Sequence, residues 1–304
     1  MSEQSVPPEL VGERLDVAVS RLLGCSRTQA ADYIDAGRVT VSGRTSARST
    51  RLVADAVIGL PDAQTDAAAE AEPEPVVELP LLYVDDDVCV IDKPVGVAAH
   101  SSPGWSGPTV TGSLVAQGIS VTGVGAAERE GIVHRLDVGT SGVMAVARTQ
   151  LAYSSLKRQF KDRTVDKIYL ALVQGHPDPS SGTIDAPIGR HSVHDFRFAV
   201  VNGGRPSITH YETVEAFAFA SLLRIKLETG RTHQIRVHMA AVKHPCCGDL
   251  TYGADPSLAK RLGLQRQWLH ASELEFEHPR TGERVSVQSP LPVDLQHALD
   301  VLSG

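Results

Sequence analysis

Hydrophobic positions near the N-terminus recur with helical spacing, and a short strand follows them. Over residues 14–23, apolar side chains return every three or four positions, which predicts a helix that Gly24 ends. A second helix is predicted over residues 27–36, and residues 38–43 predict a strand and a turn. The pattern therefore indicates a small α/β module within residues 11–60.

Most of the remaining chain has the hydrophobic patterns of β-strands. Residues 143–147 are continuously apolar, as expected for a strand that is buried on both faces. Residues 221–228 alternate between apolar and polar side chains, which is typical of a strand in an antiparallel sheet with one buried face. Residues 81–92 predict two more strands joined by an acidic turn.

Two helices are predicted between and after these strands. Thr149 is a suitable N-cap for a helix to about residue 162, and residues 231–239 predict another. The second helix would place Arg231 at its positive end, where a cation is unfavourable by about 0.3–1 kcal/mol. Either a carboxylate offsets this effect, or Arg231 points to solvent. Strands and helices together predict an α+β fold.

The composition indicates a soluble globular protein. The chain has 304 residues, of which 42% are hydrophobic, and no apolar run approaches the roughly 18 residues that span a membrane. The first residues lack the pattern of a signal peptide, so we expect a cytoplasmic protein. Four cysteines without C-x-x-C spacing predict reduced thiols and no zinc or other metal site.

The net charge of −7 argues against a nucleic-acid partner until its distribution is considered. Residues 61–87 contain nine acidic residues and no Lys or Arg, so removing them from −7 leaves +2 for the rest of the chain. A basic surface elsewhere is therefore compatible with the composition. Residues 62–78 are also rich in Ala, Glu and Pro without hydrophobic periodicity, which predicts a solvated tether.

The stretch 131–148 combines side chains that carry chemistry with a buried strand. His134, Arg135 and Asp137 precede a loop of small residues, and the apolar run 143–147 follows. Loops at the ends of core strands hold reactive groups on a rigid scaffold. An Arg–Asp pair that only closes a turn would give the same pattern, so the spacing alone leaves both interpretations open.

The N-terminal pattern S-R-x-x-A-x-x-x-I-x-x-G-x-V-x-V-S-G closely resembles the S4 RNA-binding domain. The resemblance spans about fifty residues, and by it Arg27, Arg38 and Arg44 are candidate phosphate contacts. The alternative is a small helical domain with solvated arginines, because phosphate binding needs many basic residues acting together.

Seven separated motifs of the larger part resemble the RluA family of RNA pseudouridine synthases. They are D-K-P-x-G at 92–96, H-R-L-D-x-x-T-S-G at 134–142, K-x-Y-L-A-L-V at 167–173, G-G-R-P at 203–206, L-x-T-G-R-T-H-Q-I-R-V-H at 227–238, G-D-x-x-Y-G at 248–253 and L-H-A at 269–271. With the S4-like module in front, the chain is similar to RluD-type members. It departs from the family at Val138-Gly139, where Lys-Asp is more common.

The resemblance implies a fold and a domain organisation. An S4-like module over residues 11–60 would precede an acidic linker at 61–79. A pseudouridine synthase domain over 80–304 would follow, with a mostly antiparallel mixed sheet and flanking helices.

The resemblance also implies a reaction, the isomerisation of uridine to pseudouridine, and a role for each site residue. Asp137 would attack C1′ or remove the C2′ proton, and the sequence does not choose between these routes. Arg231 would supply the counter-charge that a carboxylate needs in a water-poor pocket. Tyr169 would stack on uracil, and Arg135 would either fill the space that the base leaves when it flips out or hold the RNA backbone. We expect no cofactor.

The implied partner is RNA, namely 23S ribosomal RNA or a pre-ribosomal particle, bound by a monomer. A pseudouridine synthase acting on tRNA and a non-catalytic RNA-binding protein are the alternatives. The presence of Asp137, Tyr169 and Arg231 together argues against the second, because binding alone does not need them. Kinase and serine hydrolase interpretations fail because H-R-L-D and G-T-S-G do not match the H-R-D and G-x-S-x-G patterns.

Overall fold

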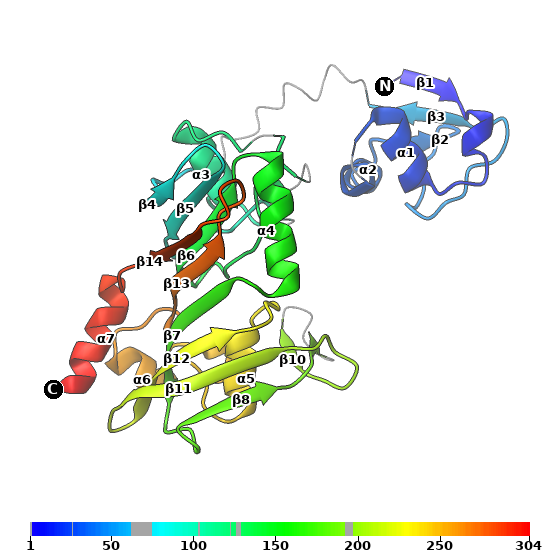
Figure 1. Ribbon diagram of the computed structural model, residues 1–304. Coiled ribbons are helices and arrows are strands. Elements are labelled where there is room, and N and C mark those ends of the chain that lie inside the picture. The colour runs from blue at the N-terminus through cyan, green and yellow to red at the C-terminus, as the bar shows by residue number, and fades with distance from the viewer. Residues whose placement is uncertain are drawn as a thin grey trace. The chain divides into compact units, whose positions relative to one another are not determined.

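The computed structural model describes residues 2–25, 27–61, 75–102, 104–121, 123–125, 129–191 and 197–304, with the side chains of residues 27 and 28 excepted. The chain divides into two compact units, Met1–Pro73 and Glu74–Gly304 (Figure 1). Each unit is described by itself below.

The first unit packs two helices and a short 3-10 turn beside a three-stranded antiparallel sheet of order β1-β3-β2. Its elements are β1 (Ser2–Ser5), η1 (Pro8–Leu10), α1 (Leu15–Leu23), α2 (Arg27–Asp35), β2 (Thr40–Val41) and β3 (Val57–Leu60). Gly24 closes α1 in the left-handed conformation, with φ 62°, as predicted. The strand and turn predicted over residues 38–43 are present as β2 and as a turn at Ser42 and Gly43, which both have positive φ.

The second unit is built on one nine-stranded sheet of order β4-β5-β6-β13-β7-β12-β11-β8, with β14 paired to β13. The strands are β4 (Leu81–Val84), β5 (Val88–Lys93), β6 (Ser141–Ala147), β7 (Asp166–Gln174), β8 (Ser181–Asp185), β11 (Ile208–Ala216), β12 (Ala220–Leu227), β13 (Leu269–Glu277) and β14 (Arg284–Gln288). Strands β9 (Ile188–Arg190) and β10 (Phe198–Val200) form a separate hairpin. Among the described strands of this sheet, β6 and β13 pair in parallel and the other neighbours pair antiparallel, so the mixed, mostly antiparallel sheet is confirmed.

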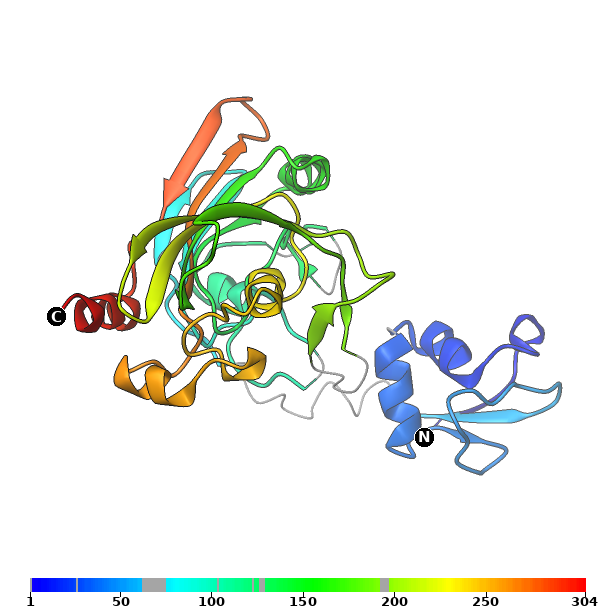
Figure 2. The same cartoon turned by 90° about the horizontal axis from the view of Figure 1, so that it is seen from below.

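Helices cover both faces of this sheet (Figures 1 and 2). They are α3 (Val110–Ala116), α4 (Gln150–Asp162), α5 (Gln234–Ala241), η3 (Leu250–Tyr252), α6 (Pro256–Arg261) and α7 (Val293–Ser303). Met144 of β6 shares a buried cluster with α3 and α5, whereas Val143 shares another with α4. Strand β6 is therefore buried on both faces, which explains its continuous apolar run.

Two details of the predicted helices are wrong. Helix α4 begins after its Thr149 cap as predicted. The helical spacing of its apolar residues predicts that Leu151 faces inward, but Leu151 is 47% exposed and Ala152 takes the inward position. Helix α5 begins at Gln234 and not at Arg231, because His233 adopts a left-handed conformation with φ 57° and ψ 22°. Arg231 therefore lies in the preceding turn, and the expected conflict with the helix dipole does not arise.

The end of the predicted tether contacts the second unit. The backbone N–H of Val77 donates to Ser113 Oγ at 3.2 Å, and that of Leu79 donates to Gln117 Oε1 at 2.9 Å. Leu79 is almost fully buried. Residues 62–74 of the tether lie outside the described residues. Over the described ranges, no helix is long and apolar enough to cross a membrane.

Candidate active site

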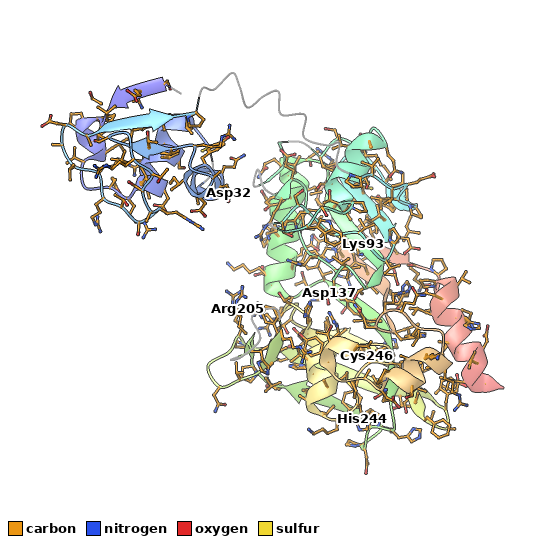
Figure 3. All side chains as sticks on the ribbon, turned by 180° about the vertical axis from the view of Figure 1, so that it is seen from behind. Asp32, Lys93, Asp137, Arg205, His244 and Cys246 are labelled. Atoms are coloured by element: carbon orange, nitrogen blue, oxygen red, sulfur yellow. The ribbon has the colours of Figure 1, made fainter. Side chains whose placement is uncertain are left out.

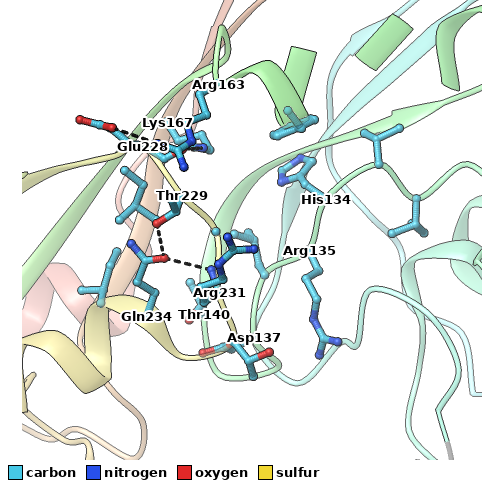
Figure 4. A pocket seen from close by; sticks show the side chains of 18 of the residues that line it. His134, Arg135, Asp137, Thr140, Arg163, Lys167, Glu228, Thr229, Arg231 and Gln234 are labelled. Atoms are coloured by element: carbon cyan, nitrogen blue, oxygen red, sulfur yellow. Dashed lines mark hydrogen bonds and ion pairs between the residues drawn. The ribbon is translucent and has the colours of Figure 1, made fainter. Parts of the chain in front are cut away.

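A large cleft in the second unit has Asp137 in its wall (Figure 4). Its volume is about 1360 Å³, and its lining comes from residues 132–137, from α4 and from the loop between β12 and α5. Nine of the lining residues are Lys or Arg and only three are Asp or Glu. The basic surface that the charge distribution allowed is therefore present here, in a chain whose net charge is −7.

The loop that carries Asp137 is fixed by the parallel pairing of β6 with β13. Gly142 has φ 117°, and a Cβ added to it would lie 2.1 Å from the backbone oxygen of Ala271, so only glycine fits this crossing. Ser141 Oγ lies 3.0 Å from His270 Nδ1 on the neighbouring strand. The T-S-G and L-H-A motifs thus meet where β6 pairs with β13, and this pairing fixes the point at which the loop that carries Asp137 ends and β6 begins.

The counter-charge of Asp137 is Arg236, not Arg231. Arg236 Nη1 donates to Asp137 Oδ2 at 3.2 Å from the first turns of α5. Two further bonds at 2.6 and 2.9 Å join the same guanidinium to both carboxylate oxygens of Asp249. Burial alone would lower the pKa of Arg236, but these two carboxylates raise it above its usual value. Arg236 therefore stays charged beside Asp137.

Arg231 lines the same cleft but has different partners. Its Nε donates to the backbone oxygen of Pro206 at 3.2 Å, and its backbone N–H donates to Gln234 Oε1 (Figure 4). Burial lowers the pKa of Arg231, and the positive charges of Arg205 and Arg163 lower it further. The turn at His233 is the physical reason why Arg236, and not Arg231, pairs with Asp137, since it directs Arg236 toward that carboxylate. Arg231 belongs instead to a cluster of cations that repel one another.

Tyr169 lies in β7 within the cleft lining and is 8% exposed. Burial raises the pKa of its hydroxyl, and the charge of Asp137 raises it further. Arg135 comes from the same loop as Asp137, is exposed, and has no ion pair within the described part of the chain. The structure thus brings Asp137, Tyr169, Arg135 and Arg231 to one cleft.

The candidate phosphate contacts of the first unit lie on its surface. Arg38 is exposed and its guanidinium lies 5.2 Å from the centre of the Tyr33 ring. Arg44 is exposed in the turn after β2. The side chain of Arg27 lies outside the described residues.

Four site residues were not predicted, namely Arg236, Asp249, His233 and Tyr252. His233 Nε2 lies 3.9 Å from Asp137 Oδ2, and its Nδ1 lies 2.8 Å from the Tyr252 hydroxyl. Asp249 and Tyr252 both come from the G-D-x-x-Y-G motif. That motif and the T-H-Q-I-R motif were recognised as separate matches, but the sequence contains no sign that they meet.

Lys93 of the D-K-P-x-G motif is fully buried. It lies in the same unit as Asp137, and Figure 3 labels both residues. Its Nζ donates to the backbone oxygens of Pro94 and Val97 at 2.8 and 2.9 Å. Burial lowers the pKa of Lys93 to about 7, although the charge of Asp137 acts in the opposite direction. The motif therefore places a second basic group within reach of the charge of Asp137.

Gly139 of the unusual Val138-Gly139 pair has a packing explanation. A Cβ on Gly139 would lie 2.6 Å from Gln267 Oε1, and the backbone oxygen of Gly139 accepts from Arg266 Nη1 at 3.3 Å. A larger residue at position 139 would have to displace Gln267, which also donates to Thr140 Oγ1.

Comparison with known proteins agrees with this geometry. Residues 87–241 match the family described as RNA pseudouridylate synthase, and residues 13–57 match the S4 domain. The chain belongs to the RNA pseudouridylate synthase family. It is therefore an isomerase that acts on RNA, as predicted. The motifs at 134–142, 167–173 and 227–238, which supply residues of the cleft, lie in the matched range, and the one at 248–253, which supplies Asp249 and Tyr252, lies just after it.

Known proteins are similar to this pseudouridine synthase over nearly its whole length. It is 59% identical over 98% of its length to a Mycobacterium bovis protein named an uncharacterized RNA pseudouridine synthase, covering 97% of that protein. It is 41% identical over 99% of its length to ribosomal large subunit pseudouridine synthase D of Nitrosomonas europaea, covering 87% of that chain. The Pseudomonas aeruginosa protein of the same name is 40% identical, with 98% and 94% covered.

Solved structures support the fold of the catalytic unit. Human RNA pseudouridylate synthase domain containing 1 is 32% identical with a TM-score of 0.58, over 73% of this chain and 86% of that one. Human RNA pseudouridylate synthase domain containing 4 is 26% identical with a TM-score of 0.59, over 74% and 93%.

Proposed function

We propose that this synthase converts uridines of large-subunit (23S) ribosomal RNA to pseudouridine, with Asp137 as the catalytic carboxylate. The observation that carries the proposal is the ion pair of Asp137 with Arg236 in a cleft where basic residues outnumber acidic ones by nine to three. A polyanion can enter such a cleft, and one carboxylate there is available to the ribose.

The reaction breaks the C1′–N1 bond of uridine, turns the uracil, and joins C5 to C1′. Asp137 acts on the ribose either by attacking C1′ or by removing the C2′ proton. In both routes its carboxylate must be ionised, and Arg236 supplies the compensating charge. Asp249 positions Arg236 through two hydrogen bonds, so its effect on the ribose is indirect.

The other side chains of the cleft serve to bind and orient the RNA. Tyr169 offers a ring on which the flipped uracil stacks, and Arg135 fills the vacated position in the RNA. Burial and the positive charges of Arg205 and Arg163 lower the pKa of Arg231, and the three guanidinium groups are suited to bind backbone phosphates. Arg38 and Arg44 of the S4 unit, together with Arg27, add phosphate contacts outside the cleft.

The proposed target rests on the relatives. Proteins named ribosomal large subunit pseudouridine synthase D match this chain over nearly its full length, including the S4 unit. A tRNA target is the alternative for the same chemistry.

Mapping of pseudouridines tests this target. In a strain that lacks the gene, we expect one or more sites in 23S rRNA to lose pseudouridine and to regain it when the wild-type gene is restored. If 23S rRNA is fully modified in the deletion strain while tRNA is not, the rRNA proposal is wrong.

A further inference from the structure

A series of hydrogen-bonded groups, from Phe198 through Tyr252 to His233, leads from β10 and η3 toward Asp137. The backbone N–H of Phe198 donates to the Tyr252 hydroxyl at 3.1 Å, and the Tyr252 hydroxyl lies 2.8 Å from His233 Nδ1. His233 Nε2, at the other end of the ring, lies 3.9 Å from Asp137 Oδ2. This series of groups thus ends beside the proposed catalytic carboxylate.

One of these bonds has a fixed direction. Because a backbone N–H can only donate, the Tyr252 oxygen accepts from Phe198 and keeps its own proton to give. His233 Nδ1, at 2.8 Å, is in position to accept that proton. When Nδ1 accepts it, the proton of the neutral imidazole is on Nε2, which faces Asp137.

The backbone conformation at His233 is unfavourable for a histidine. His233 is the N-cap of α5, but its side chain caps no backbone N–H. Its φ of 57° is a conformation that Gly or Asn adopts more readily. Strained residues of this kind cluster at active sites, where surrounding contacts hold them. Here Tyr252 and Phe198 hold the ring by edge contacts at 5.7 and 5.8 Å.

We propose that His233, held by Tyr252 with its proton on Nε2, donates a hydrogen bond to a carbonyl oxygen of the uracil as the C1′–N1 bond breaks. This inference rests on the proposed role of Asp137. When the bond breaks, its electron pair passes to N1 and spreads to the adjacent carbonyl oxygen. The His233 proton stays on Nε2 and stabilises that charge, in either route open to Asp137.

The distances and the charge state suit this role. A separation of 3.9 Å is too long for a hydrogen bond to Asp137 itself, so the Nε2 proton is available to a group bound against the carboxylate. Burial lowers the pKa of His233, which keeps the ring neutral and a donor. Tyr252 also lies against Arg236, at 4.9 Å from its guanidinium carbon, so it positions both groups that face Asp137.

Two substitutions at position 233 separate the ring's chemistry from its effect on the backbone. His233→Asn suits the left-handed conformation but is too short to place an N–H where Nε2 lies. His233→Gln keeps an N–H at about the distance of Nε2 from the backbone, but glutamine does not favour the left-handed conformation as asparagine does. Lys243→Asn is the matched control, because Lys243 also has positive φ, at 70°, near the other end of α5, and is exposed.

The measurements are the single-turnover rate at saturating RNA, the dissociation constant and the thermal midpoint of the full-length protein. We expect His233→Asn to lower the rate about tenfold or more while the midpoint is unchanged or higher and RNA affinity stays within about twofold. His233→Gln should retain more of the rate than His233→Asn. Tyr252→Phe, which no longer fixes the proton on Nε2, should lower the rate several-fold.

These experiments distinguish a wrong role for His233 from a wrong proposed function. If wild type and Lys243→Asn both convert the RNA and His233→Asn converts it equally fast, the role of His233 is wrong while that of Asp137 stands. A loss of affinity without a loss of rate would likewise overturn it. If wild type converts no uridine in the assay, the proposed function itself fails.

Discussion

Two arginines five positions apart have different surroundings, although the sequence alone does not distinguish them. Arg236 is buried between Asp137 and Asp249, whereas Arg231 contacts a backbone oxygen and is repelled by Arg163 and Arg205. The short, local motifs predicted Asp137 and Tyr169 as site residues, and the structure places both in one cleft. The counter-charge was assigned to Arg231 instead of Arg236, because the direction of each arginine depends on where α5 begins, and a left-handed histidine decides that.

Substituting each arginine by glutamine should separate the two roles. Arg236→Gln leaves the buried Asp249 without its ion pair, so we expect the free energy of unfolding to fall by about 3–5 kcal/mol and conversion to be lost. Arg231→Gln should change the free energy of unfolding by less than about 0.5 kcal/mol. It should weaken RNA binding and reduce the salt dependence by about one unit in slope. Urea unfolding and binding across salt concentrations measure these effects; equal stability losses would contradict the assignment.

Lys93 predicts a pH dependence of stability. Its pKa in the folded protein is about 7, below the value of 10.5 of an unfolded chain, so the unfolded state binds more protons between these values. The free energy of unfolding should therefore rise with pH from about 7 to 10.5. Lys93→Met, which cannot titrate, should have a smaller slope across this window. Urea unfolding at several pH values checks this, and parallel curves for the two proteins would refute it.

Among the elements, the strand patterns were predicted well and the helix starts less well. The apolar run of β6 and the alternation of β12 follow directly from burial on two faces and on one. The parallel pairing of β6 with β13 joins residues that are about 130 positions apart in the chain, and no local pattern encodes it. That pairing also explains why position 142 requires glycine, which the sequence alone does not reveal.

Gly142→Ala tests the crossing of these strands. The new Cβ would meet the backbone oxygen of Ala271, which cannot move without disturbing the sheet, so we expect a loss of roughly 1–3 kcal/mol or more in the free energy of unfolding. Gly118→Ala is the matched control, because Gly118 has φ 78° and open space around its Cβ position. A similar loss in both variants would show that backbone strain, and not the close contact, accounts for the effect.

For the whole molecule, the average charge is a poor guide to the partner. The net charge of −7 hides a cleft lined by nine basic residues, because nine acids are concentrated in residues 61–87. The two family matches, 13–57 and 87–241, fall in separate compact units. Binding and catalysis are therefore expected to respond separately when one unit is removed.

Deleting residues 1–60 tests this division. We expect the truncated protein to bind rRNA more weakly and with a smaller salt dependence, because phosphate contacts are lost. Its single-turnover rate on a short RNA at saturation should change little, because the cleft lies wholly in the second unit. Unchanged affinity at every salt concentration would argue against RNA binding by the S4 unit.

The central claim is that Asp137 performs the chemistry, and one measurement tests it most directly. Asp137→Asn keeps the size of the side chain and removes its charge. Conversion of uridine by this variant should be compared with wild type under single-turnover conditions, with RNA binding measured in the same samples. We predict no pseudouridine while RNA binding persists. Conversion at the wild-type rate by Asp137→Asn would contradict the account.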